Sequence, residues 1–273
     1  MLINKERDIM KKKLIVVADD YGFSEAYSLG AVKAYKEGIV TVLSLMSNMD
    51  AARFAIDLWK KECPEACLGQ HTNFVQGKPV SKDLETMVDE NGYFYRSTMW
   101  KPLYPGDTKS TGSIVVSYED AKKETLAQLE RHKELTGFYP CHFEGHSVGT
   151  PEINRAFEEI SDEMGIHSMS QKAASDKLHY AHELVLDSRE YITLLHQGFT
   201  AEAFMDDICG ILRSEHEYNV LHFHPGYLDA YVVDNSTLTI PRLRDVQTLT
   251  DPRVKQWLID NDIELTDFRA LYK

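Results

Sequence analysis

The chain has 273 residues, of which 43% are hydrophobic and 27% charged, a composition typical of a folded globular protein and not of a disordered one. Its formal net charge of -13 would repel a phosphate backbone, so nucleic acid is not an expected partner. No secretory signal and no run of about 18 apolar residues is visible, so we expect a cytoplasmic protein without membrane contact.

The four cysteines are neither paired as in a zinc ribbon nor dense enough for a disulfide scaffold; they are Cys63, Cys67, Cys141 and Cys209. Reduced thiols with structural roles are therefore expected, including the pair at 63 and 67. Residues 1–12 are charged and are expected to form a flexible N-terminal extension, within which Met1 and Met10 are both candidate starts.

Strands and helices are predicted to alternate from the start of the folded region. Residues 14–18 form a continuous apolar, β-branched run that is typical of a buried strand, and Ser24 can cap the helix after it. The first predicted elements are a strand over 14–18, a helix from Ser24 to Ile39, a strand over 41–46, a helix capped by Asp50 through Trp59 and a strand over 68–72.

A long irregular segment over 77–118, rich in Gly, Pro, Ser and aromatic residues, interrupts this alternation and is expected to cross one face of the fold. Such segments often carry substrate contacts. The later predicted elements are a helix from Ser117 to Leu135 stopped by Gly137, a strand over 139–144, a helix from Thr150-Pro151, strands over 191–195 and 219–223, and a last helix from Asp251-Pro252.

This alternation indicates an α/β protein with a mostly parallel sheet, either closed as a barrel or open and doubly wound. Neither GxGxxG nor GxxxxGK[ST] opens a helix, which disfavours nucleotide binding and favours the barrel. The prediction is one TIM-barrel-like (β/α) domain over residues 1–273, with the long segment over its active-site face.

Polar residues gather at the carboxyl ends of the predicted strands, which in a β/α barrel meet at one mouth. They are Asp19, Asp20, His71, Glu144, His146 and His224. One carboxylate of the Asp pair can bind metal while its neighbour accepts a proton, although such pairs also cap helices or turn the chain. Taken alone, His71 is expected more often to be a half-buried strand histidine than a ligand.

Two further histidine motifs support a site at this mouth. In the run from His142 to His146, positions 142, 144 and 146 share one side of a strand and present three polar groups together. His224 precedes Pro225, is expected at the rim, and as a rim histidine would titrate near neutrality and suit general acid work; the alternative is a turn histidine without a task. Asp and His ligands with open positions are typical of a hydrolytic metal site.

Five sequence blocks follow one another along the chain. They are Val17–Gly22, Gly38–Thr41 with Ser44–Met46 and Asn48, Gly69–Asn73 with Gly77–Val80, His142–His146, and His224–Gly226. They resemble the motifs ADD(F/Y)G, GLHxN with GKPV, HxDxH and HPG of the YdjC-like family, which includes chitooligosaccharide deacetylases. The resemblance covers nearly the whole chain and implies a barrel-like β/α fold.

The resemblance also implies roles. Asp20, His71 and His146 would hold one divalent metal ion, zinc or magnesium, with manganese or cobalt as alternatives. Asp19 would be the general base, and His224 would donate a proton to the leaving amine. Glu144, His142 and Asn73 are candidates for positions around the metal or against the substrate.

The chain departs from the family pattern at three positions: Glu144 replaces the usual Asp, Thr72 a usual Leu, and Val148 a common His. A longer carboxylate at 144 is expected to change how His71 or a metal-bound water is oriented, and hence substrate preference.

The expected activity is metal-dependent removal of acetyl groups from N-acetylated amino sugars of the chitobiose or chitooligosaccharide type. A small acetylated oligosaccharide is the expected partner, the aromatic residues of segment 77–118 could stack on its rings or pack over the barrel, and a homodimer is a candidate assembly. The alternatives are a barrel-type metal phosphoesterase, whose sites hold two or three metals, and a degenerate sugar-binding protein in which Glu144 marks lost catalysis.

Overall fold

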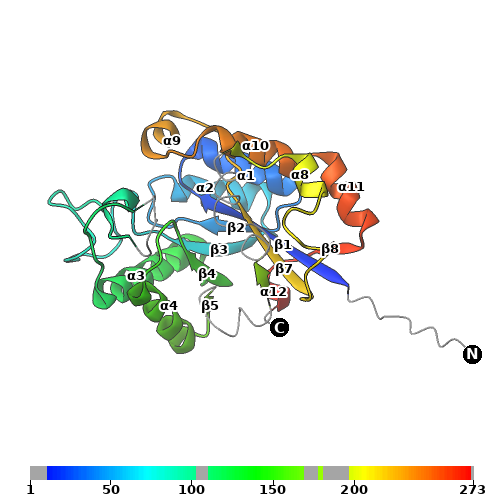
Figure 1. The fold of residues 1–273 in the computed structure, drawn as a ribbon. Helices are drawn as coiled ribbons and strands as arrows, with labels where there is room; N and C mark the ends of the chain where they lie inside the picture. Colours follow the sequence, from blue (N-terminus) through cyan, green and yellow to red (C-terminus); the bar gives the residue numbers. More distant parts are fainter. Residues whose placement is uncertain (1–10, 103–109, 169–177, 181–196, 272–273) are drawn as a thin grey trace, which may run out of the picture.

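The computed structural model describes residues 11–102, 110–168, 178–180 and 197–271 (Figure 1). The predicted strand over 191–195 and residues 1–10 lie outside these ranges. Lys12 was expected in the flexible extension but is the first residue of a strand. The strands are β1 (Lys12–Tyr21), β2 (Val42–Leu45), β3 (Cys67–Thr72), β4 (His142–Gly145), β5 (His167–Ser168), β6 (Leu178–Tyr180), β7 (Tyr218–Phe223) and β8 (Ile263–Leu265).

These strands form one eight-stranded sheet in the order β5-β4-β3-β2-β1-β7-β6, with β8 pairing with β1 off this path. Every pairing is parallel. Within the described ranges no pairing joins β5 to β6, so the sheet is an open arc. The predicted barrel-like α/β fold is confirmed in this form.

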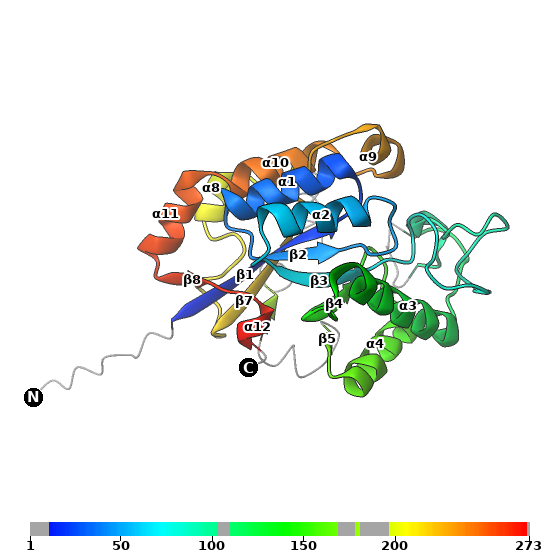
Figure 2. The same cartoon turned by 180° about the vertical axis from the view of Figure 1, so that it is seen from behind.

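The helices are α1 (Glu25–Lys36), α2 (Ala52–Glu62), α3 (Tyr118–Thr136), α4 (Pro151–Met164), α8 (Ala201–Met205), α9 (Ala230–Asn235), α10 (Ile240–Leu249), α11 (Pro252–Asp260) and α12 (Phe268–Leu271), with the 3₁₀ turn η1 (Ser97–Met99). Figures 1 and 2 show α1, α2, α8, α10 and α11 together on one side of the sheet, while α3 and α4 lie beside β3, β4 and β5. No described helix is both long and apolar enough to cross a bilayer.

The alternation of side chains along β1 separates two cores. Leu14, Val16 and Ala18 face the helix layer and pack against α1, α2, α8 and α11. Ile15 and Val17 face the inside of the arc, where α12 contributes Phe268 and Leu271 to a smaller apolar cluster. Because side chains alternate, Asp19 continues the inward-facing set and extends the interior into a polar layer.

The helix N-termini show which of the predicted capping residues are correct. Ser24, Ser117 and Thr150 cap α1, α3 and α4 as predicted, each accepting a backbone N–H from the first turn. The prediction that Asp50 caps α2 is wrong, since Ala51 holds the cap position without a side-chain bond. The helix after Asp251 is also not the last, because α12 follows it.

The described parts of the long segment, residues 77–102 and 110–118, lie at the side of the molecule toward which β1 runs (Figure 1). Phe94 and Trp100 are buried in a core shared with α3 and α4, so packing explains them better than sugar stacking; Tyr93 remains 47% exposed. On α3, Asp120 and Glu124 accept backbone N–H groups of the segment. These bonds fix the segment to the sheet's flank.

Candidate functional site

Strand register brings the predicted polar residues to one place. His71 on β3 is directly opposite Glu144 on β4, and Val17 on β1 is opposite His222 on β7. Asp19 lies two residues beyond Val17 on the same face. The inward-facing side chains of β1, β3, β4 and β7 therefore meet inside the arc, close to the carboxyl ends of the strands.

Asp20, His71 and His146 form a tight triangle. Asp20 Oδ1 lies 2.8 Å from His146 Nδ1 and 3.2 Å from His71 Nε2, and the two ring nitrogens are 3.1 Å apart. Bonds of about 2.0–2.2 Å at tetrahedral or octahedral angles would separate the donor atoms of one metal ion by about 2.8–3.6 Å. The triangle has the dimensions of one side of a metal coordination sphere.

The chemistry of the donors also fits a divalent ion. Asp20 is fully buried, and its Oδ1 has no hydrogen-bond partner among the described residues although two ring nitrogens are close. A buried carboxylate oxygen normally has such a partner. A carboxylate and two imidazoles around one unsatisfied oxygen form a donor set suited to zinc and to other first-row divalent ions.

Arg242 on α10 holds the other oxygen of Asp20, with Nη1 2.8 Å from Oδ2. Burial opposes ionisation of Asp20, but the charges of His146 and Arg242 outweigh it and bring the pKa of this carboxyl well below its ordinary value. Asp20 also has a positive φ of 61°, which turns the chain at the end of β1. Asp20 is thus a fixed, ionised ligand candidate.

Asp19 has a different partner. His222 Nδ1 lies 3.1 Å and 3.2 Å from its two carboxylate oxygens, and the Tyr27 hydroxyl donates to its backbone carbonyl. Burial lowers the pKa of His222, but Asp19 and Glu144 raise it more strongly, to about 9. The imidazolium of His222 therefore stands between two carboxylates at neutral pH.

Glu144 contacts several groups at the centre of the interior. Its Oε1 accepts a hydrogen bond of 2.5 Å from Ser44 and lies 3.3 Å from His71 Nδ1. Its Oε2 lies 3.7 Å from His222 Nδ1 and 3.9 Å from His142 Nε2. The carboxylate can thus orient the ring of a candidate metal ligand through the nitrogen that faces away from the metal.

His224 differs from its prediction in one respect. Its backbone N–H donates to Asp245 Oδ2 at 2.9 Å, and its Nε2 lies 4.0 Å from Asp19 Oδ2. Burial lowers the pKa of His224 to about 4, so the expected titration near neutrality is wrong for the protein without metal. Burial also raises the pKa of Asp245 to about 7.

Two predicted site residues stand apart from the triangle. Asn73 organises the turn after β3, where its side chain bonds to Asn48 and to the backbone of residues 75 and 76. His142 faces Glu144 with one nitrogen and Cys141 with the other. Within the described residues neither contacts Asp20, His71 or His146.

Sequence reasoning missed His222, Arg242 and Asp245. His222 could have been found, because it shares a strand face with Val220 and points inward where the strand turns polar. Arg242 and Asp245 lie on α10, and no local pattern indicates that this helix packs against the end of β1.

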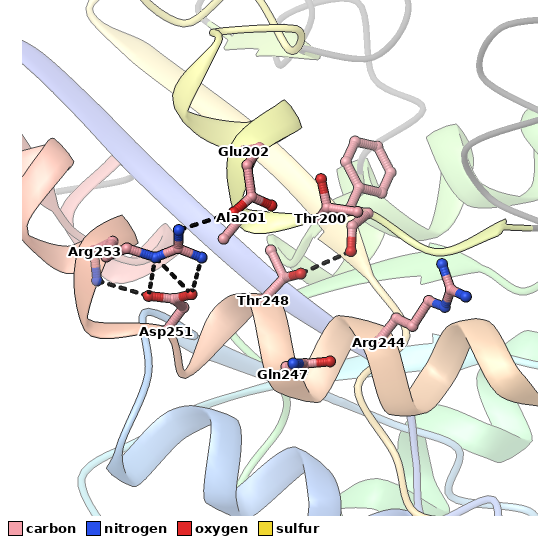
Figure 3. Close-up of a pocket in the computed structure, with 9 residues that line it drawn as sticks. Thr200, Ala201, Glu202, Arg244, Gln247, Thr248, Asp251 and Arg253 are labelled. Atoms are coloured by element: carbon pink, nitrogen blue, oxygen red, sulfur yellow. Dashed lines mark hydrogen bonds and ion pairs between the residues drawn. The ribbon is translucent and has the colours of Figure 1, made fainter.

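A pocket of about 170 Å³ lies between α8 and the helices α10 and α11 (Figure 3). None of its lining residues belongs to the polar cluster described above. Its Arg253 is already paired with Asp251 and Glu202, and Thr248 donates to the carbonyl of Phe199. This pocket is therefore separate from the candidate metal centre.

The chain is similar to curated proteins over nearly all of its length. It is 30% identical over 267 residues to a protein of Listeria innocua serovar 6a named carbohydrate deacetylase 2, covering 96% of this chain and 99% of the relative. It is also 30% identical to a carbohydrate deacetylase of Clostridium beijerinckii, covering 95% of this chain and all of that protein.

A similar crystal structure is that of an Enterococcus faecalis V583 protein named for cellobiose-phosphate cleavage. It has a TM-score of 0.78 and 21% identity, covering 96% of this chain and 99% of the other. This likeness supports the fold. The model of the family described as YdjC-like protein matches residues 13–260, from β1 to the end of α11. The chain therefore belongs to the YdjC-like family.

Proposed function

We propose that this protein is a metal-dependent carbohydrate deacetylase that hydrolyses the N-acetyl group of an amino sugar, with chitobiose or a related oligomer as substrate. The observation that carries the proposal is the triangle of Asp20, His71 and His146, with donor atoms 2.8–3.2 Å apart beside the carboxylate of Asp19. The relatives' names support the carbohydrate and the acetyl group.

Asp20, His71 and His146 would hold the divalent ion, for which zinc fits the donors and magnesium, manganese and cobalt are the other candidates. When bound, such an ion supplies Lewis acidity, which polarises the acetyl carbonyl and acidifies water. Arg242 keeps Asp20 ionised and fixes its direction, and Glu144 fixes the ring of His71.

Asp19 is the proposed general base. It accepts a proton from the attacking water as the new C–O bond forms at the acetyl carbon. Its own orientation is set by His222, which contacts both oxygens, and by its position two residues beyond Val17 on the inward face of β1. The contact with His222 holds both carboxylate oxygens of Asp19 in place before the reaction.

His224 is the proposed proton donor to the leaving amine. Because its ring is neutral before the reaction, the proton must reach it during turnover, and Asp19 Oδ2 is 4.0 Å from its Nε2. The proton taken from water can pass from Asp19 to His224 and then to the nitrogen as the C–N bond breaks. The products are acetate and a free amino sugar.

A screen of N-acetylated sugars with detection of released acetate tests this proposal. Chitobiose and short chitooligosaccharides should release acetate, with loss of activity after chelation and recovery with zinc or another divalent ion. Hydrolysis of phosphate monoesters without acetate release would assign the site to a metal phosphoesterase. Binding of sugars without any turnover would assign it to a degenerate sugar-binding protein.

A further inference from the structure

A second group of potential ligands lies deeper in the arc. The Sγ atoms of Cys67 and Cys141 and a ring nitrogen of His142 lie within 4.8 Å of one another. Cys67 is 1% exposed, His142 is fully buried and Cys141 is half-buried. The cysteines were expected to be reduced thiols with structural roles, and the four are free; the neighbouring strands β3 and β4 place Cys67 beside Cys141.

The imidazole ring of His142 is confined by its neighbours on two sides. Its ring lies over Gly69 on β3, where an added Cβ would be 2.2 Å from the His142 Cε1 atom. The ring of Phe268 from α12 covers it, with centroids 3.9 Å apart. A glycine on one strand and an aromatic ring on the last described helix thus fix the imidazole, and any larger residue at 69 would displace it.

In this orientation the two ring nitrogens of His142 face different groups. Nδ1 is 3.4 Å from Cys141 Sγ, close to the separation of about 3.5 Å that sulfur and nitrogen ligands have on one tetrahedral zinc ion. Nε2 has no hydrogen-bond partner among the described residues and lies 3.9 Å from Glu144 Oε2. Metal-bound histidines usually present their second nitrogen to a carboxylate in this way.

We propose that Cys67, Cys141 and His142 form a second metal site, which takes a thiophilic divalent ion such as Zn²⁺ and is distinct from the triangle at the strand ends. Two sulfur donors disfavour Mg²⁺ and Mn²⁺, which prefer oxygen ligands. Glu144 lies between the two sites and faces a histidine of each, His142 with Oε2 and His71 with Oε1. Its length, greater than that of the usual Asp, lets one carboxylate serve both.

Cobalt titration tests the site, because Co²⁺ bound to thiolate has a charge-transfer absorption that Co²⁺ bound only to Asp and His lacks. The full chain is reduced, stripped of metal, supplied with Mg²⁺ and then titrated with Co²⁺. We expect the thiolate band to saturate at about one Co²⁺ per chain. Absence of the band, with free thiols verified, overturns the proposal.

Cysteine substitutions show which thiols produce the absorption band. C67S/C141S should lose it and bind one Co²⁺ fewer, whereas the matched control C63S/C209S, which alters two other buried cysteines, should retain it. His142→Ala should weaken the Co²⁺ affinity at this site about tenfold or more. Persistence of the band in C67S/C141S, or its loss in the control alone, overturns the assignment.

A measurement on the unmodified protein is independent of whether these variants fold. Cys141 is the partly exposed ligand, so bound Cd²⁺ should slow its alkylation by iodoacetamide at least tenfold. Mg²⁺ should not slow this reaction, and equal alkylation rates with and without Cd²⁺ reject the site. Acetate release is scored separately. A thiolate band without acetate release rejects only the deacetylase proposal, and acetate release without a band rejects only the second site.

Discussion

Asp19 and Asp20 are adjacent residues with different surroundings. Asp20 is held by Arg242 and two histidines of the triangle, whereas the carboxylate of Asp19 contacts His222 and, at a longer distance, His224. The positive φ of Asp20 separates the directions of the two carboxylates at the strand end. The two residues are therefore expected to respond differently to the same substitution.

Asp19→Asn should depress turnover by about 10²-fold or more while metal content stays near the wild-type level, because the amide keeps the shape but cannot accept the proton. Asp20→Asn should lose metal and activity together, because a ligand is weakened. Acetate release measured beside metal content distinguishes the two roles. Loss of metal from Asp19→Asn, or full turnover by it, would show that base and ligand are assigned the wrong way round.

His222 should make the stability of the metal-free protein depend on pH. Its pKa rises from 6.5 to about 9 on folding, so its contribution is fully present below pH 6.5 and is lost as the pH rises through 9. His222→Gln should therefore destabilise the protein by an amount on the order of 3 kcal/mol near pH 6 and much less near pH 9.5. Urea unfolding of both proteins at the two pH values measures the difference.

The control for this experiment is His132→Gln. Burial lowers the pKa of His132 to about 3, so this histidine is neutral over the whole range and its substitution should cost the same at both pH values. A pH-independent difference between wild type and His222→Gln would contradict the ion pair with Asp19 and Glu144.

The sequence allowed individual site residues to be predicted where strand ends have a clear pattern. Asp20, His71 and His146 each lie at or just past the carboxyl end of a predicted strand, and the fold brings their donor atoms within 3.2 Å of one another. Arg242 could not be predicted in this way, because its contact with Asp20 spans 222 positions and depends on how α10 packs. Long-range packing of this kind has no signature in a window of neighbouring residues.

At the scale of elements, α3 connects the long segment to the sheet. Its first turn is capped by Ser117, its buried acids accept backbone N–H groups, and Gln128 bonds both to Asn73 and to Glu124. Its end is equally defined, because Gly137 adopts a left-handed conformation with φ of 93°. The helix therefore holds the start of the irregular segment, at residues 80–86, through its buried acids.

Gly137→Ala should destabilise the protein by about 1 kcal/mol through backbone conformation alone, because an added Cβ at this position meets no atom within 4 Å. Gly137→Asn should cost less, since Asn tolerates the left-handed region better than Ala. Denaturant unfolding compares the three proteins. Equal stability of Gly137→Ala and wild type would mean that the helix end relaxes without cost.

Long amphipathic or capped elements were predictable, and short ones were not. Ser117, Gly137 and Pro151 marked α3 and α4 correctly because cap residues act locally. The two or three residues of β5, β6 and β8, and the four of α12, are too short to show a period. Tertiary pairing determines their conformation, so their own sequences carry little signal.

At the scale of the whole molecule, the formal charge of -13 favours neutral substrates over anionic ones. We expect kcat/KM for an uncharged acetylated sugar to change by less than about twofold between low and high salt. A phosphorylated analogue should instead react faster as salt rises, because ions screen the repulsion. Initial rates at matched pH in sodium chloride measure both. A steep salt dependence for the neutral sugar would contradict this expectation.

Strand β1 has partners from both ends of the described chain. Its first residues pair with β8 and β7, its last with β2, and α12 fills the interior behind it. During synthesis on the ribosome, β1 is therefore made more than 200 residues before β7 and β8, which its first half requires. Until residues 263–271 follow, Ile15 and Cys67 lack the side chains of Phe268 and Leu271 that pack with them in the folded protein. The first half of β1 thus lacks its pairing strands for most of translation, and we expect chaperones that bind extended hydrophobic segments to recognise it during this time.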